Sequence, residues 1–398
     1  MFRWTAFVLA VTSVGAAVPT PLYPIYASRF DFSAGVLGIV FASYTVGVLV
    51  TLFLVAPQAD HFGRRRLLYL GMALTAVAAL LFAVSTGVLE LAIARLVSGL
   101  AVGATTSVAT AAMADLEPNR DQHHVARVTV AANFGGFALA VLLSGFLVEY
   151  APFPSVLPFL IPIGGSIVGA LAIRGIPETA PGFVARRGWA VQRISVPVEI
   201  RGSFWVAAGG LAACYSIYGF FAALVPSYMR TGLGVSSPFA AGAIVALMFG
   251  TAAAIQLATP QIRDRRALLV GFPLLLVTLI GLVVILPVDS WVAASVVTFA
   301  LGAAVGLTFM GSVTLVDRIS PEDRRDDVLA GFYAAGYLAL AVPTIGVAEA
   351  SGLVGLTDAG VALGLVVAVL VLFLYVGAIR TPTPPGGGGR PRDSPGHG

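Results

Sequence analysis

Long apolar segments limit the fold of this chain more than any other feature, because they follow one another almost without interruption. Of the 398 residues, 58% are hydrophobic and only 11% are charged, which is far from the composition of soluble proteins. A hydrocarbon core about 30 Å thick needs roughly 20 apolar residues for each spanning helix. The sequence therefore predicts an all-α polytopic membrane protein without a sizeable soluble domain.

Twelve segments have the length and the low charge that a membrane helix requires. The first begins after a single charge, Arg3, and it is too long and too rich in proline for a signal peptide, so we expect it to remain as a helix. The predicted spans lie near residues 4–27, 34–57, 67–86, 88–114, 126–149, 156–173, 203–226, 236–258, 267–287, 291–316, 328–350 and 358–379.

The positive charges indicate in which direction these helices cross the membrane. All 23 positive residues are arginines. With the N-terminus inside, twenty of them fall in cytoplasmic segments, whereas Arg29 and Arg230 fall outside and Arg95 falls within a span. Because short cytoplasmic loops carry the excess of Lys and Arg, both termini are predicted to be cytoplasmic. The alanine-rich, lysine-free composition is typical of a GC-rich bacterial genome, so we expect a bacterial inner (plasma) membrane protein.

Other classes of protein lack the residues that they need. The basic charges form short clusters between apolar runs instead of one continuous face, which argues against nucleic acid as a partner. A single cysteine, Cys214, excludes a disulfide within the chain and a multi-cysteine metal site. The adjacent His123 and His124 lack a third ligand, so we expect no metal. No nucleophile–base grouping or phosphate-binding glycine loop occurs, so we expect neither an enzyme nor a cofactor.

The second half of the chain repeats the first at a shift of 203 residues. Pro57-Gln58 falls on Pro260-Gln261, and Gly47 falls on Gly250. At the same shift Gly99 falls on Gly302 and Gly103 on Gly306, and with small insertions the register continues to Asp115 with Asp317 and Glu149 with Glu349. The shared offset predicts two pseudo-symmetric six-helix bundles, an arrangement that suits a transporter with a site at the bundle interface. We expect paired glycines to let helices approach closely.

This repeat divides the chain into four predicted parts. They are an N-terminal bundle (1–173), a cytoplasmic linker (174–202), a C-terminal bundle (203–379) and a disordered cytoplasmic tail (380–398) that is too rich in Gly and Pro to bury a core.

The loop from Ala56 to Arg66 resembles the signature loop of the major facilitator superfamily, Gly-x-x-x-Asp-Arg-x-Gly-Arg-Arg. Asp60, Gly63, Arg64 and Arg65 match that pattern, whereas Ala56 and His61 depart from it. With twelve spans and the repeat, the resemblance extends over nearly the whole chain. It implies a monomeric transporter that works by alternating access on a small-molecule substrate, with this loop as a gating motif that closes the cytoplasmic side. The alternative is that the arginines only anchor the loop at anionic membrane lipid.

Arg95 is the only charge well inside a predicted span. A lipid-facing Arg costs several kcal/mol, so its side chain must face protein or water. The run from Arg95 to Gly103 resembles a family motif that implicates such an Arg in proton transfer. Since Arg cannot release a proton, a carboxylate must titrate, and Glu90 and Glu149 are the nearest candidates by depth. The alternative is a structural ion pair between Arg95 and a carboxylate. The family's antiporter motif is degenerate in 136–145, where the expected proline is missing.

The family resemblance implies a substrate cavity between the bundles. A cavity rich in Tyr, Phe and hydroxyls with one charge suits an amphipathic or aromatic molecule, and suits phosphate or dicarboxylate poorly because those need convergent cations. Many of the hydroxyls will bond their own helix backbone instead. The candidate substrate-cavity residues are Tyr23, Tyr26, Thr105, Asn133, Tyr215, Tyr218, Thr308 and Tyr337.

The sequence thus favours a secondary active exporter of drug-like or amphipathic molecules that works by proton antiport. The runner-up is a facilitator or uptake permease for a neutral metabolite or sugar. A third hypothesis, from another class, is a membrane receptor or scaffold that keeps the fold without transport.

Overall fold

A computed structural model describes residues 1–58, 62–179, 191–259, 261–262, 264–285, 288 and 290–380. Within these residues, eleven helices are long and apolar enough to cross a membrane, and a twelfth apolar helix of 17 residues, Leu157–Ile173, stands at the sixth position. The order of helices agrees with the predicted spans. The prediction of an all-α membrane protein with twelve helices is confirmed.

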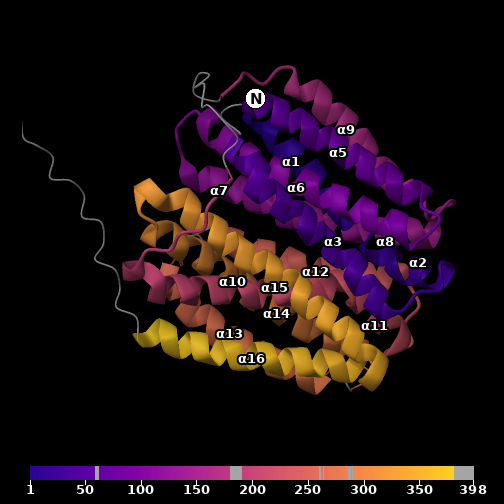
Figure 1. The fold of residues 1–398 in the computed structure, drawn as a ribbon. Coiled ribbons are helices and arrows are strands. Elements are labelled where there is room, and N and C mark those ends of the chain that lie inside the picture. Colours follow the sequence, from indigo (N-terminus) through magenta and orange to yellow (C-terminus); the bar gives the residue numbers. More distant parts are fainter. Residues whose placement is uncertain are drawn as a thin grey trace, which may run out of the picture.

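The first six spans form one bundle, drawn in indigo to purple in Figure 1. Three of these spans are interrupted, and two of them contain a π-helical segment. In chain order the elements are α1 (Phe2–Ala17), η1 (Thr20–Leu22), α2 (Tyr23–Arg29), α3 (Ala34–Val50), η2 (Thr51–Val55), η3 (Ala56–Gln58), α5 (Arg64–Val84), α6 (Val88–Leu116), α7 (Gln122–Val130), η4 (Ala131–Gly135), α8 (Gly136–Tyr150) and α9 (Leu157–Ile173).

The last six spans form a second bundle that lies beside the first (Figure 1). Its first span continues past α10 into the short α11, as α1 continues into α2 in the first bundle. The elements are η5 (Val198–Ile200), α10 (Arg201–Ala223), α11 (Val225–Thr231), α12 (Pro238–Ala258), α13 (Asp264–Ile285), α14 (Trp291–Ile319), η6 (Glu322–Arg324), α15 (Arg325–Val354) and α16 (Leu356–Arg380).

The two bundles meet mainly along two helix pairs, α3 with α15 and α8 with α12. These pairs are related by the repeat, because α3 and α12 are the second helices of their halves and α8 and α15 are the fifth. Residues 180–190 and 381–398 lie outside the described residues, so the predicted linker and disordered tail remain predictions.

Paired glycines bring the second and fourth helices of each half into close contact. A Cβ atom at Gly99 would overlap the backbone carbonyl of Tyr44 and lie 3.1 Å from the Gly47 Cα. In the second half, a Cβ at Gly302 would lie 2.6 Å from the Met248 carbonyl oxygen. Such backbone contact is possible only without side chains at the crossing. The predicted close approach at these glycines is therefore present in both halves.

We expect Gly99→Ala to destabilise the protein, because the added methyl would meet backbone that cannot rotate away. Overpacking of this kind costs about 1–3 kcal/mol. The matched control is Gly164→Ala in α9, where nothing lies within 4 Å of an added Cβ and the better helix propensity of Ala should be neutral or stabilising. Thermal unfolding in detergent measures both, and equal melting temperatures would contradict this description of the crossing.

Candidate functional site

Aromatic rings from both halves meet at the bundle interface. From the first half, Phe134 in η4 and Phe137 in α8 reach across, and Phe137 stacks on Phe249 of α12 with ring centroids 4.2 Å apart. Phe134 lies 5.6 Å from the Tyr218 ring of α10 and 5.1 Å from the Phe309 ring of α14.

Two further tyrosines extend this group within the second half. Tyr215 on α10 packs edge-on against Tyr337 of α15 at 5.3 Å, and its ring is nearly parallel to that of Phe309 at 6.4 Å. We call the whole set the central aromatic cluster. It consists of Phe134, Phe137, Tyr215, Tyr218, Phe249, Phe309 and Tyr337.

Polar groups accompany these rings. The π-helical turn Ala131–Gly135 carries Asn133, whose Oδ1 accepts a hydrogen bond of 2.9 Å from Ser13 Oγ on α1. The Tyr218 hydroxyl is buried and has no hydrogen-bond partner among the described residues. Since buried polar groups are normally paired, this hydroxyl is a candidate ligand contact. π-helical turns occur frequently at functional sites.

The predicted cavity residues fall into three groups. Asn133 and the tyrosines 215, 218 and 337 lie at or beside the central aromatic cluster. Thr105 and Thr308 are fully buried inside their own halves, where their hydroxyls lie against Gly71 and Gly271.

The other two predicted cavity residues, Tyr23 and Tyr26, lie away from the cluster in the buried core beyond the end of α1. The Tyr26 hydroxyl donates to the Phe82 carbonyl at 3.2 Å. The sequence did not identify the four phenylalanines of the cluster as candidate site residues, because a Phe that faces a bundle interface has the same sequence signal as one that faces lipid.

Arg95 is 2% exposed and sits among aromatic faces. Its guanidinium carbon lies 5.4 Å from the Tyr23 ring centroid, 5.0 Å from Phe41 and 5.5 Å from Tyr44. Its Nη1 donates to the Ala16 carbonyl at 2.7 Å, at the end of α1, while its Nε is buried without a partner among the described residues. Desolvated cation–π contacts contribute about 2 kcal/mol. The charge is thus held by rings and a backbone carbonyl.

Neither predicted carboxylate contacts Arg95 in the described structure. Glu90 lies beside its own helix start, with Oε1 3.5 Å from Thr86 Oγ1. Glu149 instead reaches across to the second half, where it accepts hydrogen bonds from Ser237 Oγ and from the Phe239 backbone N–H.

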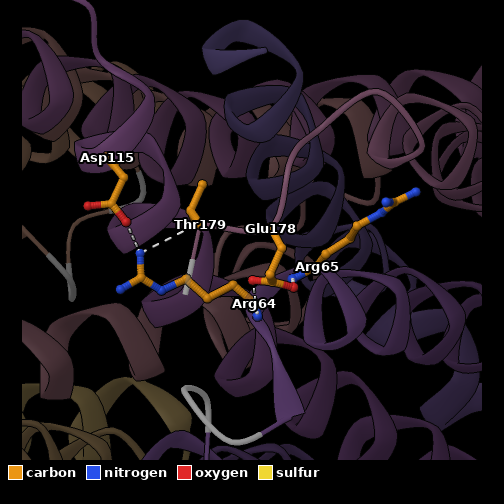
Figure 2. A network of polar contacts seen from close by, with 5 residues as sticks. All are labelled: Arg64, Arg65, Asp115, Glu178 and Thr179. Carbon is orange, nitrogen blue, oxygen red and sulfur yellow. Dashed lines mark hydrogen bonds and ion pairs between the residues drawn. The ribbon is translucent and has the colours of Figure 1, made fainter. Parts of the chain in front are cut away.

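The gating-motif arginines form a polar network at one end of the protein (Figure 2). We call this end, where α5, α13 and α15 begin, the arginine-rich end. Arg64 pairs with Asp115 at the end of α6, and Glu178 accepts backbone hydrogen bonds from Arg64 N at 2.9 Å and Arg65 N at 3.2 Å. Gly63 has a φ of 85°, where only Gly is unstrained. Glu178 therefore caps the N-terminus of α5. Asp60 lies outside the described residues.

The second half contains a related ion pair that joins different helices. Asp317, the repeat partner of Asp115, pairs with Arg325 at the start of α15, the fifth helix of its half, whereas Asp115 pairs with Arg64 at the start of the third. Arg65 donates to the Arg174 carbonyl after α9, and Arg265 likewise donates to the Ala378 carbonyl of α16 at 2.9 Å. These contacts tie helices within one half to each other, so a relative movement of the halves would leave them intact.

The contacts at the opposite end join the two halves. The short helices α2 and α11 pack together at the end away from the N-terminus (Figure 1). There Arg230 Nη1 donates to the Pro24 carbonyl at 3.1 Å, and Glu149 bonds the start of α12.

Two pseudo-symmetric six-helix bundles with a candidate site between them are the architecture of a membrane transporter. Residues 5–344 match the family model of the Major Facilitator Superfamily, and the chain belongs to this family. A gallate transporter of Pseudomonas putida is 25% identical over 213 residues, which cover 51% of this chain and 46% of the relative. The quinolone resistance protein NorA of Staphylococcus aureus is 24% identical over 134 residues, 34% of this chain and 32% of NorA.

The match to these curated relatives thus spans about half of their length or less. The crystal structure of a D-xylose-proton symporter superposes with a TM-score of 0.78 over 95% of this chain and 96% of the symporter. At 15% sequence identity, this likeness concerns the fold.

We expect Glu178→Ala to lower the stability of the first bundle, because two backbone N–H groups at the start of α5 lose their acceptor. Loss of such a cap costs about 1 kcal/mol. Glu178→Gln should cost less, since an acceptor oxygen remains. Glu199→Ala is the matched control, because Glu199 is exposed. Thermal unfolding is the measurement, and a Glu178→Ala protein as stable as the control would disprove the cap.

Proposed function

We propose that this protein is a secondary active exporter of planar, amphipathic small molecules, driven by proton antiport through alternating access. The observation that carries the proposal is the central aromatic cluster, to which both halves contribute. A site shared by two bundles changes its exposure when the bundles rock. We further propose that the protein works as a monomer in a bacterial inner membrane, with the arginine-rich end and both termini in the cytoplasm.

The chemistry of the cluster supports an aromatic substrate. Aromatic pairs contribute about 0.5–1.5 kcal/mol beyond the area that they bury, and a planar ligand can replace ring–ring contacts such as Phe137 with Phe249. The Tyr218 hydroxyl, which has no partner among the described residues, and the Asn133 amide offer a few polar contacts for orientation. Arg95 is the one buried cation among the described residues, which is too little for phosphate because phosphate needs convergent positive groups.

The relatives support the same substrate class. Gallate and quinolones each contain a planar aromatic ring, and one relative is a transporter of the former while the other confers resistance to the latter. The aligned segments cover half of each relative or less, so the choice between these compounds rests on experiment.

The contacts at the two ends support an inward-facing conformation. Bonds between the halves, such as Arg230 with Pro24 and Glu149 with Phe239, lie at the end that we take as extracellular. At the arginine-rich end, the ion pairs lie within each half, and the linker residue Gln192 bonds to both halves. In this conformation a substrate would reach the central aromatic cluster from the cytoplasm, as an exporter requires.

A second candidate is a facilitator or uptake permease for a neutral metabolite or sugar. It is favoured by the surroundings of Arg95, whose charge is held by rings and the Ala16 carbonyl with no carboxylate in contact among the described residues. Proton antiport needs a titrating carboxylate such as Glu90 or Glu149. A facilitator does not, and a protonophore would leave its transport intact.

Transport in everted membrane vesicles with an acid interior tests the proposal. We expect an aromatic or amphipathic compound to dissipate the proton gradient only when the protein is present, and Arg95→Ala to abolish the effect. Phe134→Ala should raise the compound concentration that gives a half-maximal response by about two- to tenfold, because it removes ring contacts worth about 0.5–1.5 kcal/mol.

The matched control is Phe373→Ala on α16, where the ring is 72% exposed. An equal loss in Phe373→Ala would argue against the cluster as the binding site. Substrate flux without proton movement would favour the facilitator. A receptor or scaffold would be favoured if the protein inserts normally but transports no compound, and if Arg95→Ala leaves cellular phenotypes unaltered.

A further inference from the structure

We propose that Glu149 and Glu349 are two symmetry-related latches that close the end opposite the arginine-rich end, each by placing its carboxylate on the N-terminus of a helix in the other half. The proposal rests on the proposed function only in taking that end as the extracellular gate.

Glu149 forms the first latch, between α8 and α12. Its Oε2 accepts hydrogen bonds from the Phe239 backbone N–H at 2.9 Å and from Ser237 Oγ. Ser237 is the N-cap of α12, where its Oγ also accepts from Ala240 N at 3.0 Å. The first turn of a helix presents unpaired N–H groups and a partial positive charge. A carboxylate from the opposite half therefore completes the start of α12.

Glu349 forms the second latch, between α15 and α3. Its carboxylate lies against Gly35 in the first turn of α3, so closely that a Cβ atom at Gly35 would overlap Oε1 and lie 3.0 Å from Oε2. The N-cap of α3 is Ser33, whose Oγ accepts from Val36 N at 3.4 Å. The glycine thus leaves the space that an anion needs above the first turn of the helix.

The helix crossings next to the two glutamates also correspond. Beside Glu149, a Cβ at Gly242 would lie 2.7 Å from the Val141 carbonyl oxygen. Beside Glu349, a Cβ at Gly38 would lie 3.2 Å from Ile345 Cα. Each crossing therefore combines a glycine near the start of one helix with a glutamate from the end of its partner in the other half. The same arrangement occurs once at each of the two main helix contacts between the bundles.

The strength of such contacts fits a gate that must open in every cycle. Both glutamates lie at exposed helix ends, where a charge at a helix N-terminus shifts an equilibrium by a factor of roughly two to five. Two latches together can therefore hold the end closed, while rocking of the halves can release both. The ion pairs of the arginine-rich end lie within single halves and would not oppose that movement.

Cysteine accessibility tests the proposal without any transport substrate, so its outcome is independent of the export hypothesis. Thr20 is fully buried in η1, which packs against α12 at the closed end. We would introduce Thr20→Cys into the full-length protein in lipid nanodiscs and follow its reaction with a membrane-impermeant maleimide. Cys214 is fully buried, so the protein without Thr20→Cys measures the background.

We expect Glu149→Gln and Glu349→Gln each to increase the labelling rate by roughly two- to fivefold, and the double variant to show the product of the two effects. Asp358→Asn is the matched control, because Asp358 is an exposed carboxylate in the first turn of α16 at the same end. Unchanged labelling in a folded double variant would overturn the proposal, and so would an equal increase in the control.

Gly35→Ala provides a second, independent test. Its methyl group would displace the flexible Glu349 carboxylate from α3 without removing any charge. We expect labelling to increase as in Glu349→Gln, with no further increase when both changes are combined. Fully multiplicative effects of Gly35→Ala and Glu349→Gln would show that the carboxylate does not act through α3, and would contradict the second latch.

Discussion

The structure depends on close backbone contact between helices at positions without side chains. Within a bilayer the backbone must satisfy its own hydrogen bonds, so the chain can cross only as helices, and those helices gain little from hydrophobic association. Direct contact between helix backbones at glycine positions supplies the packing instead. The crossings at Gly99 and Gly302 fix the second and fourth helices of each half, and the crossings at Gly38 and Gly242 join the halves. The same kind of contact thus packs the helices within each bundle and joins the two bundles.

Charge is distributed differently at the two ends of this framework. At the arginine-rich end, Arg64 and Arg325 pair with acidic residues of their own bundle. At the opposite end, Arg230 and Glu149 bond across the interface. Between these ends lie the central aromatic cluster and the ring-enclosed Arg95. Ion pairs thus join helices within each half at one end, whereas polar contacts join the two halves at the other end.

The sequence predicted the features that follow from composition and periodicity. The spans, the repeat, the close glycine contacts and the burial of Arg95 in protein all depend on strong local signals. The partner of Glu149 and the position of Glu349 could not be predicted, because they depend on how two distant helices cross. The contributions of Phe134 and Phe249 were also missed, since a hydrophobic side chain in a membrane helix has the same sequence signal toward lipid and toward protein. The π-helical turn that carries Asn133 could not be predicted either, because the periodicity of apolar residues does not reveal it.

Alternating access by two bundles requires that the two ends of the protein move in opposite directions. Distances between spin labels measure these movements most directly. One pair of labels spans the two bundles at the arginine-rich end, at Arg120 and Asp323, and a second pair spans them at the other end, at Phe153 and Leu353. All four side chains are exposed. Without a gradient or substrate, we predict a longer and broader distribution at the arginine-rich end, and opposite shifts of the two distances when a transported compound is added. Distances that stay fixed, or that change in the same direction at both ends, would contradict alternating access by these two bundles.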